Sequence, residues 1–257
     1  MTGLPESRAG SVVVRTSGSQ VRAVCVVVPV HDEEALLGRC IAALRHAVDL
    51  ERSRAGAVSV EVVLVLDGCT DASASIARLS PFRVVEVSER RVGAARATGV
   101  EAGLAALREV SGTLPDAAVW IASTDADSVV PQHWVSSQLE LAEQGADVVV
   151  GTVRPDPTDL TARQRAAWSA THVPGRANGH VHGANLGMRA DVYAAAGGYP
   201  PVDEHEDVVL VARARAAGAR VVASDDAWVL TSGRQQGRTP GGYARYLRED
   251  LVDESSV

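Results

Sequence analysis

The sequence of 257 residues contains no lysine, and all 25 of its basic residues are arginines. Lysine forms Schiff bases, and it also completes the P-loop and the nucleotide site of protein kinases. Its absence excludes these three kinds of chemistry. Arginine offers a planar guanidinium group instead, which makes paired, charge-assisted hydrogen bonds to phosphate and carboxylate groups.

Long apolar runs and an excess of positive charge are also missing. No apolar run approaches the roughly 18 residues that a membrane-spanning helix needs, and residues 1–20 lack the apolar core of a signal peptide. The net charge of -7 disfavours a protein whose main partner is nucleic acid. We therefore expect no transmembrane segment and no nucleic-acid partner.

Cysteine is scarce, and the three present are Cys25, Cys40 and Cys69. An odd number without the spacing of a metal site predicts reduced thiols, and reduced thiols predict a cytoplasmic protein. Hydrophobic residues make up 46% of the chain and charged residues 22%, which excludes a mostly disordered chain. The richness in Ala, Val and Arg without Lys suggests a GC-rich bacterial genome.

Strand and helix patterns alternate from residue 21 onward, after a tail over residues 1–20 that is rich in Gly, Ser and Thr. Apolar β-branched runs are typical of strands buried on both faces, and residues at helical spacing separate them. The alternation predicts an α/β fold with three layers, in which helices cover both faces of a mostly parallel sheet. We expect strands over 24–30, 60–66, 82–87, 117–122 and 147–151, and helices over 33–48, 91–110 and 131–143.

Acidic residues follow three of the expected strands. Glu33 comes after the first strand, Asp67 ends the second, and Asp125 and Asp127 follow the fourth. Ligands of such sheets bind at the carboxyl ends of the strands, so these acids should converge at one edge. Carboxylates at this spacing are suited to Mg²⁺ or Mn²⁺ beside a substrate phosphate, although acids also cap helices in solvated loops.

The alternation weakens after residue 152. Residues 154–183 predict a long loop with one helix over 162–170, and such loops are usually functional or mobile. The helix expected over 204–217 begins with acids, which the helix dipole alone would favour. We also expect short strands over 186–190, 220–223 and 228–230 and a small helix over 191–196.

Other classes with aspartates at a strand end fit less well. Phosphatases of the haloacid dehalogenase type need a lysine, which this chain lacks. Sugar nucleotidyltransferases use a Gly-rich basic loop after the first strand, whereas residues 29–34 read PVHDEE. A dinucleotide site is not predicted, because no G-x-G-x-x-G follows that strand.

Five segments in order resemble the motifs of family 2 glycosyltransferases. The segment 26–42 (VVVPVHDEEALLGRCIA) resembles V-x-x-P-x-x-N-E-E, and 64–71 (LVLDGCTD) resembles V-D-D-G-S-T-D. The segment 91–103 (RVGAARATGVEAG) is similar to N-x-G-x-x-x-A-R-N-x-G, and 124–128 (TDADS) matches D-x-D. The segment 183–210 resembles the acceptor-side motif that ends in Glu-Asp. The resemblance implies a GT-A fold and the transfer of a sugar from a nucleotide-diphosphate donor.

The resemblance also implies roles for residues on the donor side. Pro29 and Val30 are expected along the nucleoside, Glu33 at the ribose and Asp67 at the base. Two residues from the third motif, Gly93 and Arg96, are expected near the diphosphate or as support for that loop. Arg96 would alternatively be a charge on the helix surface or a buried support for the D-x-D. The D-x-D itself supplies the expected metal ligand, Asp127, and a sugar or metal contact, Asp125.

On the acceptor side, Asp207 matches the family's general base and Glu206 would orient it or touch the acceptor. A base in this place implies direct displacement with inversion, although the sequence also leaves a retaining outcome open. His180 and His182 form a His-x-His pair whose side chains would face one way if the segment were a strand. They would be a zinc site, part of the acceptor pocket or ordinary surface histidines. The residues expected at the acceptor are Gly183, Asn185, His182 and Trp168.

The chain departs from the family pattern mildly at Asp32, where Asn is usual, and more importantly at positions that bear on the base and the metal. Leu66 stands where the family has the first acid of an Asp-Asp pair, and Thr231 or Ser232 stands where many members have a late metal-binding histidine. The cation would then be held by Asp127, water and the diphosphate. Arg234 and Arg238 are expected to fold over the phosphates as part of a closing tail, although such tails are often only solvated.

The expected organisation is one domain over 21–235, with a nucleotide-binding half (21–128), an acceptor-binding half (129–235) and a second tail over 236–257. UDP- and GDP-sugars are both open as the expected donor, and the expected acceptor is a small molecule or a lipid-linked sugar. Two other functions stay open. One is a sugar nucleotidyltransferase that releases pyrophosphate, and the other is a nucleotide-sugar binding protein without turnover.

Overall fold

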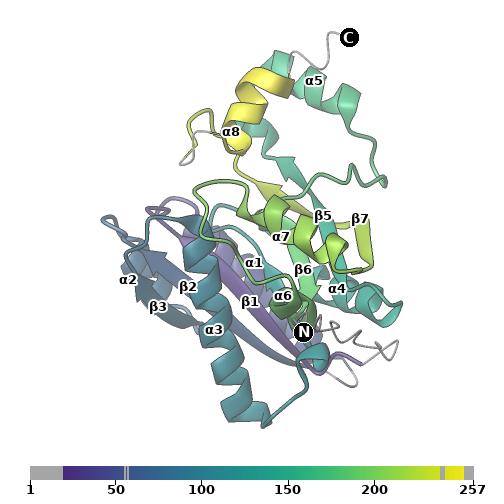
Figure 1. Cartoon of the computed structure of the whole chain (residues 1–257). Helices are drawn as coiled ribbons and strands as arrows, with labels where there is room; N and C mark the ends of the chain where they lie inside the picture. The colour runs from purple at the N-terminus through teal and green to yellow at the C-terminus, as the bar shows by residue number, and fades with distance from the viewer. Residues whose placement is uncertain (1–19, 55, 57, 238–240, 252–257) are drawn as a thin grey trace, which may run out of the picture.

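The computed structural model describes residues 20–54, 56, 58–237 and 241–251. They form a seven-stranded sheet in the order β3-β2-β1-β4-β6-β5-β7, with helices on both faces (Figure 1). This arrangement confirms the expected three-layer α/β fold. The strands are β1 (Ala23–Val30), β2 (Ser59–Asp67), β3 (Arg83–Val87), β4 (Val119–Ser123), β5 (Val148–Pro155), β6 (Leu186–Arg189) and β7 (Val221–Thr231).

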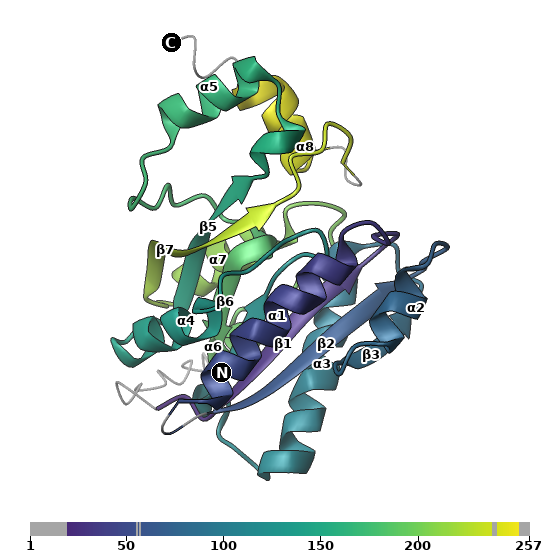
Figure 2. The same cartoon turned by 180° about the vertical axis from the view of Figure 1, so that it is seen from behind.

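Two hydrophobic cores lie on opposite faces of this sheet (Figures 1 and 2). One face carries α1 (Leu37–Arg52), α2 (Ser73–Arg78) and α4 (Trp134–Glu143). The other face carries α3 (Val92–Ser111), α6 (Ala190–Ala195) and α7 (Glu206–Ala216). Successive side chains of β1 and β2 point alternately into the two cores. Both faces of these strands are therefore buried, which explains their nearly continuous apolar sequence.

A third, smaller cluster lies beyond the ends of β5 and β7. There α5 (Ala162–Thr171) packs beside α8 (Tyr243–Arg245) and the following π-helical turn (Tyr246–Asp250). Leu247 and Leu251 are fully buried in it. The region that we expected as a tail from residue 236 therefore contains a packed helical segment. Residues 1–19 and 252–257 of the two expected tails lie outside the described residues.

The strand directions place the polar loops together. β1 pairs in parallel with both β2 and β4, so the ends of these three strands reach the same edge of the sheet. β6 runs antiparallel to β4 and β5, and β7 is parallel to β5. Among the described residues, no helix is long and apolar enough to cross a membrane.

Several expected elements differ from the structure in their bounds, and the two strands near the end of the chain and the first helix differ most. The two short strands expected over 220–223 and 228–230 are one strand, β7, because its register against β5 shifts between Gly151 and Val153 and lets a polar stretch continue the pairing. The first helix begins at Leu37 rather than at Glu33. Residues 33–36 form a turn instead, where Ser73 accepts a hydrogen bond from the backbone N–H of Glu33 (2.8 Å).

Candidate active site

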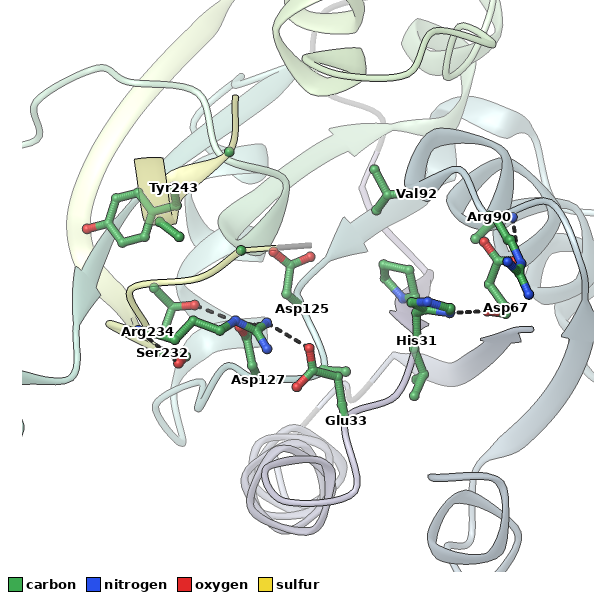
Figure 3. Close-up of a pocket in the computed structure, with 18 residues that line it drawn as sticks. His31, Glu33, Asp67, Arg90, Val92, Asp125, Asp127, Ser232, Arg234 and Tyr243 are labelled. Carbon is green, nitrogen blue, oxygen red and sulfur yellow. Dashed lines mark hydrogen bonds and ion pairs between the residues drawn. The ribbon is translucent and has the colours of Figure 1, made fainter. Parts of the chain in front are cut away.

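The loops after β1, β2 and β4 surround a cavity of about 300 Å³ at this edge, and the segment after β7 closes it (Figure 3). Seven of the residues that the sequence placed at the donor site line this cavity. They are Pro29, Val30, Glu33, Asp67, Asp125, Asp127 and Arg234. His31, Arg90 and Tyr243 also line it, and sequence reasoning assigned them no role. Tyr243 stands just after a Gly-Gly pair, which is the one signal that marks it.

Asp67 fixes the turn at one end of the cavity. Its Oδ1 accepts a hydrogen bond from the backbone N–H of Arg90 (2.8 Å), and its Oδ2 accepts one from that of Arg91 (3.2 Å). The backbone oxygen of Asp67 lies 2.5 Å from Nδ1 of His31, which connects this turn to the loop after β1. Each carboxylate oxygen has a second lone pair, so Asp67 can still accept a hydrogen bond from a ligand.

Asp32 ties the loops after β1 and β2 together. Its backbone has a positive φ of 49°, and its Oδ1 accepts a hydrogen bond from the backbone N–H of Thr70 (2.6 Å). These contacts hold the pKa of Asp32 below its usual range. Cys69 donates a weak hydrogen bond to the backbone oxygen of Val30 (3.3 Å), which joins the same two loops.

Asp127 of the D-x-D lies in a dense group of charges. Its side chain is 11% exposed, and one nitrogen of Arg234, Nη2, lies 2.5 Å from its Oδ2 and 2.7 Å from Oε1 of Glu33. The hydroxyl of Thr231 lies 3.3 Å from Oδ1 of Asp127. Burial and the nearby carboxylate of Asp125 raise the pKa of Asp127 to about 6, although Arg234 opposes this shift. The site thus holds more negative charge than one guanidinium neutralises.

Asp125, the other acid of the D-x-D, forms an ion pair with the buried side chain of Arg96. The guanidinium of Arg96 is 4% exposed; Nη2 lies 2.5 Å from Oδ1 of Asp125, and Nη1 pairs closely with Glu206. Burial alone would lower the pKa of Arg96, but these two carboxylates raise it. Arg96 therefore has the position of a buried support for the D-x-D, which was one of the places expected for it. Gly183 packs against it, and a Cβ there would lie 2.4 Å from the guanidinium carbon.

A second cavity of about 490 Å³ shares Asp125 and Tyr243 with the first. Asp207 lines it, and its Oδ2 accepts a hydrogen bond from the backbone N–H of Gly183 (2.6 Å). His182 lines it too, and burial lowers the pKa of this imidazole to about 4. The carboxylate of Asp207 thus lines a second cavity that lies beside Asp125 of the D-x-D. Glu206 is buried against Arg96, and burial raises its pKa.

Three expected site residues lie elsewhere. Asn185 is 2% exposed, and its side chain accepts a hydrogen bond from the indole of Trp134 and donates two to the backbone oxygens of Thr152 and Ala227. A buried amide with these partners is an interior structural residue. Trp168 stacks on His172 with ring centroids 4.0 Å apart and belongs to the small cluster at α5.

Gly93 lies at the start of α3, against Glu206 rather than in either cavity. A Cβ at this position would lie 3.1 Å from the backbone oxygen of Pro200. Gly93 thus lets α3 approach the start of α7. His180 and His182 belong to no strand, so the condition for a pair on one strand face is not met. Their rings meet edge to face with centroids 6.3 Å apart. Arg238 lies outside the described residues.

The family of the chain is shown by its sequence. Residues 25–195 match the model of glycosyl transferase family 2, which is more than half of the chain. The chain therefore belongs to this family, and the resemblance drawn from the five motifs is confirmed. No curated protein sequence matches the chain significantly.

Solved glycosyltransferase structures share the fold at low sequence identity. TarS 1–349 of S. aureus in complex with UDP is 13% identical with a TM-score of 0.57, and the match covers 83% of this chain and 61% of that one. The mannosyltransferase PcManGT of Pyrobaculum calidifontis, in complex with GDP-Man and Mn²⁺, is 18% identical with a TM-score of 0.57 and coverages of 93% and 75%.

Glucosyl-3-phosphoglycerate synthase of Mycobacterium tuberculosis, in complex with Mn²⁺, UDP and glucosyl-3-phosphoglycerate, is 17% identical with a TM-score of 0.51. That match covers 92% of this chain and 81% of the synthase. These likenesses confirm the GT-A fold. The chain spans less than two thirds of the TarS fragment and 39% of a longer TarS chain.

Proposed function

We propose that this chain transfers a sugar from a UDP- or GDP-sugar to an acceptor hydroxyl. The observation that carries the proposal is the pair of adjacent cavities that meet at the D-x-D, one lined by Asp67 and Asp127 and the other by Asp207. Family membership and the nucleotide complexes of TarS and PcManGT support this assignment.

The donor would lie in the first cavity. Its nucleoside would lie along Pro29 and Val30, with the base at the free lone pairs of Asp67 and the ribose near Glu33. Its diphosphate would come to the D-x-D, where the guanidinium of Arg234 is the nearest described cation to Asp127. Guanidinium groups bind phosphate oxygens through paired hydrogen bonds, so Arg234 suits a phosphate contact.

The acidic end of the first cavity fits Mg²⁺ or Mn²⁺. Hard divalent cations take oxygen ligands, and the Asp127 carboxylate, the second acid Asp125 and the Thr231 hydroxyl offer them here. Because the carboxylates of Asp125 and Glu33 lie close to that of Asp127, an added positive charge would be favourable here. When bound beside the diphosphate, such a cation would neutralise the charge of the leaving group. Mn²⁺ is present in the PcManGT complex.

Asp207 would act as the general base. An acceptor hydroxyl in the second cavity gives its proton to the Asp207 carboxylate as its oxygen attacks the anomeric carbon. The bond between that carbon and the diphosphate breaks, and the nucleoside diphosphate leaves with the electron pair. Attack from the second cavity, opposite the diphosphate, inverts the anomeric centre. The hydrogen bond from the Gly183 N–H orients Asp207 for this role.

Replacement of the base tests the proposal. We expect Asp207→Asn to lower the release of UDP or GDP from the donor, with an acceptor present, by about 10²- to 10⁴-fold, and to leave donor binding intact. The matched control is Asp203→Asn, which removes an exposed acid of the same loop and should keep the wild-type rate.

If Asp207→Asn transferred the sugar at the wild-type rate, Asp207 would not be the general base. Release of pyrophosphate instead of a nucleoside diphosphate would identify a nucleotidyltransferase. Donor binding without turnover in the wild-type chain would identify a binding protein. The acceptor, whether a small molecule or a lipid-linked sugar, and the cytoplasmic location stay predictions.

A further inference from the structure

A short segment after β7 brings Arg234 to the D-x-D. Asp159 holds this segment, because its Oδ2 accepts a hydrogen bond from the backbone N–H of Gly233 (2.8 Å). Gly233 packs closely here, and a Cβ would lie 3.0 Å from the backbone oxygen of Asp156. The position of Arg234 is thus set by the fold on two sides, which is unlike a loosely solvated surface arginine.

The guanidinium of Arg234 occupies the space in front of two buried acids (Figure 3). One nitrogen bridges Oδ2 of Asp127 and Oε1 of Glu33, whose side chains are 11% and 8% exposed. Arg96 already neutralises much of the neighbouring Asp125. Arg234 is therefore the positive charge that balances Asp127 in this structure.

A divalent cation at Asp127 would compete with this contact. The metal and the guanidinium would share the electron pairs of one carboxylate, and their positive charges repel each other at such short range. The hydroxyl of Thr231 would be a weak additional ligand and would add little to the affinity for the metal. The cation would bind more tightly once Arg234 had another anion to contact.

We infer that Arg234 is a built-in counter-ion that competes with Mg²⁺ or Mn²⁺ for Asp127 until the diphosphate of the donor draws it away. The inference rests on the proposed function, because it assigns the diphosphate to this cavity. It makes Arg234 a specificity-determining residue: the chain selects the complex of metal and nucleoside diphosphate over the metal alone. Because such coupling is reciprocal, the metal also strengthens nucleotide binding.

Binding of Mn²⁺, followed by the electron paramagnetic resonance of the free ion, tests this inference on the full chain. A neighbouring unit charge changes the affinity of a carboxylate for a cation by about tenfold or more. Without nucleotide, we expect Arg234→Met to bind Mn²⁺ at least about tenfold more tightly than the wild type, and Arg234→Lys to bind with an intermediate affinity. With UDP or GDP present, the difference between the wild type and Arg234→Met should shrink.

The matched control is Arg154→Met. It also removes one partly buried arginine from an ion pair, the one with Asp225 (2.7 Å), but Arg154 stacks on Trp228 outside both cavities. This variant should bind Mn²⁺ as the wild type does. Circular dichroism and the melting temperature confirm that each variant is folded, and Arg234→Lys serves if Arg234→Met is not.

Equal affinities of the wild type and Arg234→Met for Mn²⁺ alone would overturn the inference, as would an equal gain in Arg154→Met. No measurable Mn²⁺ binding by Arg234→Met would overturn it as well. A different result would refute the proposed function and leave this inference standing in part. A gain of Mn²⁺ affinity in Arg234→Met, with no effect of UDP or GDP on any variant, would keep the competition and refute the placement of the donor diphosphate.

Discussion

Arg96 connects acidic residues on the donor side and the acceptor side of the site. Its buried guanidinium joins Asp125 of the D-x-D to Glu206, the neighbour of the proposed base. A buried ion pair of this kind adds little net stability, but loss of one partner leaves an unpaired buried charge and costs about 3–5 kcal/mol. We therefore regard Arg96 as the group that fixes the distance between the donor side and the acceptor side.

His182 makes the stability of the protein depend on pH. Burial is the largest cause that lowers its pKa to about 4 from a usual value of 6.5, although Asp207 and Asp125 act in the opposite direction. Between these two values the unfolded state binds more protons than the folded state, so the free energy of unfolding falls as the pH falls from about 6.5 to 4. The loss from this one group should reach up to about 3 kcal/mol.

The change that tests this is His182→Gln, which cannot titrate. We expect its free energy of unfolding, from urea denaturation at pH 7 and pH 5, to fall less with acidification than that of the wild type. His46→Gln is the control, since His46 is exposed on α1, and this variant should preserve the wild-type slope. A slope unchanged by His182→Gln would show that other groups cause the acid sensitivity.

For single residues, the sequence predicted where the acidic side chains lie better than it predicted which side chains they contact. Asp67, Asp125 and Asp127 follow buried strands, and parallel strands bring such positions to one edge. The ion pair of Arg234 with Asp127 joins residues 107 positions apart, and no periodic pattern encodes it. Asn185 matched a motif, yet its role depends on Trp134 and Ala227, which become neighbours only in the fold.

Among the elements, α3 shows how glycine permits close packing on the sheet. Gly99 and Gly103 face β1 and β2 one helical turn apart. A Cβ on Gly99 would lie 2.4 Å from Cγ1 of Val27, and one on Gly103 would lie 2.3 Å from Sγ of Cys25. Because the start of α3 contacts Asp67 and carries Arg96, this close packing also positions the site.

A pair of glycine substitutions tests this packing. We expect Gly99→Ala to destabilise the protein by about 1–3 kcal/mol, since the added methyl group overlaps two valines of the sheet. Gly38→Ala in α1 should instead stabilise it by about 0.5–1 kcal/mol, because no atom lies within 4 Å of the added Cβ and alanine favours the helix. Urea denaturation measures both, and equal effects would contradict the account of α3.

Element boundaries followed local patterns, and the errors have structural causes. The parallel strands β1 and β2 were predictable because they are buried on both faces. β7 was not predicted as one strand, because Asp225 and Asp226 interrupt its apolar pattern. Asp225 is accommodated by its ion pair with Arg154 and by a hydrogen bond from the Gly175 N–H. Local sequence shows neither partner.

For the whole molecule, the order of the strands decides where the chemistry lies. β1 lies between β2 and β4, so the loops that carry Glu33, Asp67 and the D-x-D meet around one cavity. The second half of the chain returns through the antiparallel β6 and places Asp207 beside that cavity. The order of the motifs predicted a donor side followed by an acceptor side, whereas only the Gly-Gly pair before Tyr243 marked the packed segment at residues 243–251.

The measurement that tests the central claim most directly is a thermal-shift titration of the full chain with UDP, GDP and CDP, each with Mn²⁺ and with EDTA. A ligand that binds only the folded state stabilises it by about 2.7 kcal/mol at one hundred times its dissociation constant, which corresponds to a rise of roughly 5–10 °C for a chain of this size. The account predicts this rise for one nucleotide with Mn²⁺ and a smaller rise with EDTA. An unchanged melting temperature with all three nucleotides and Mn²⁺ would contradict a donor site at this edge of the sheet.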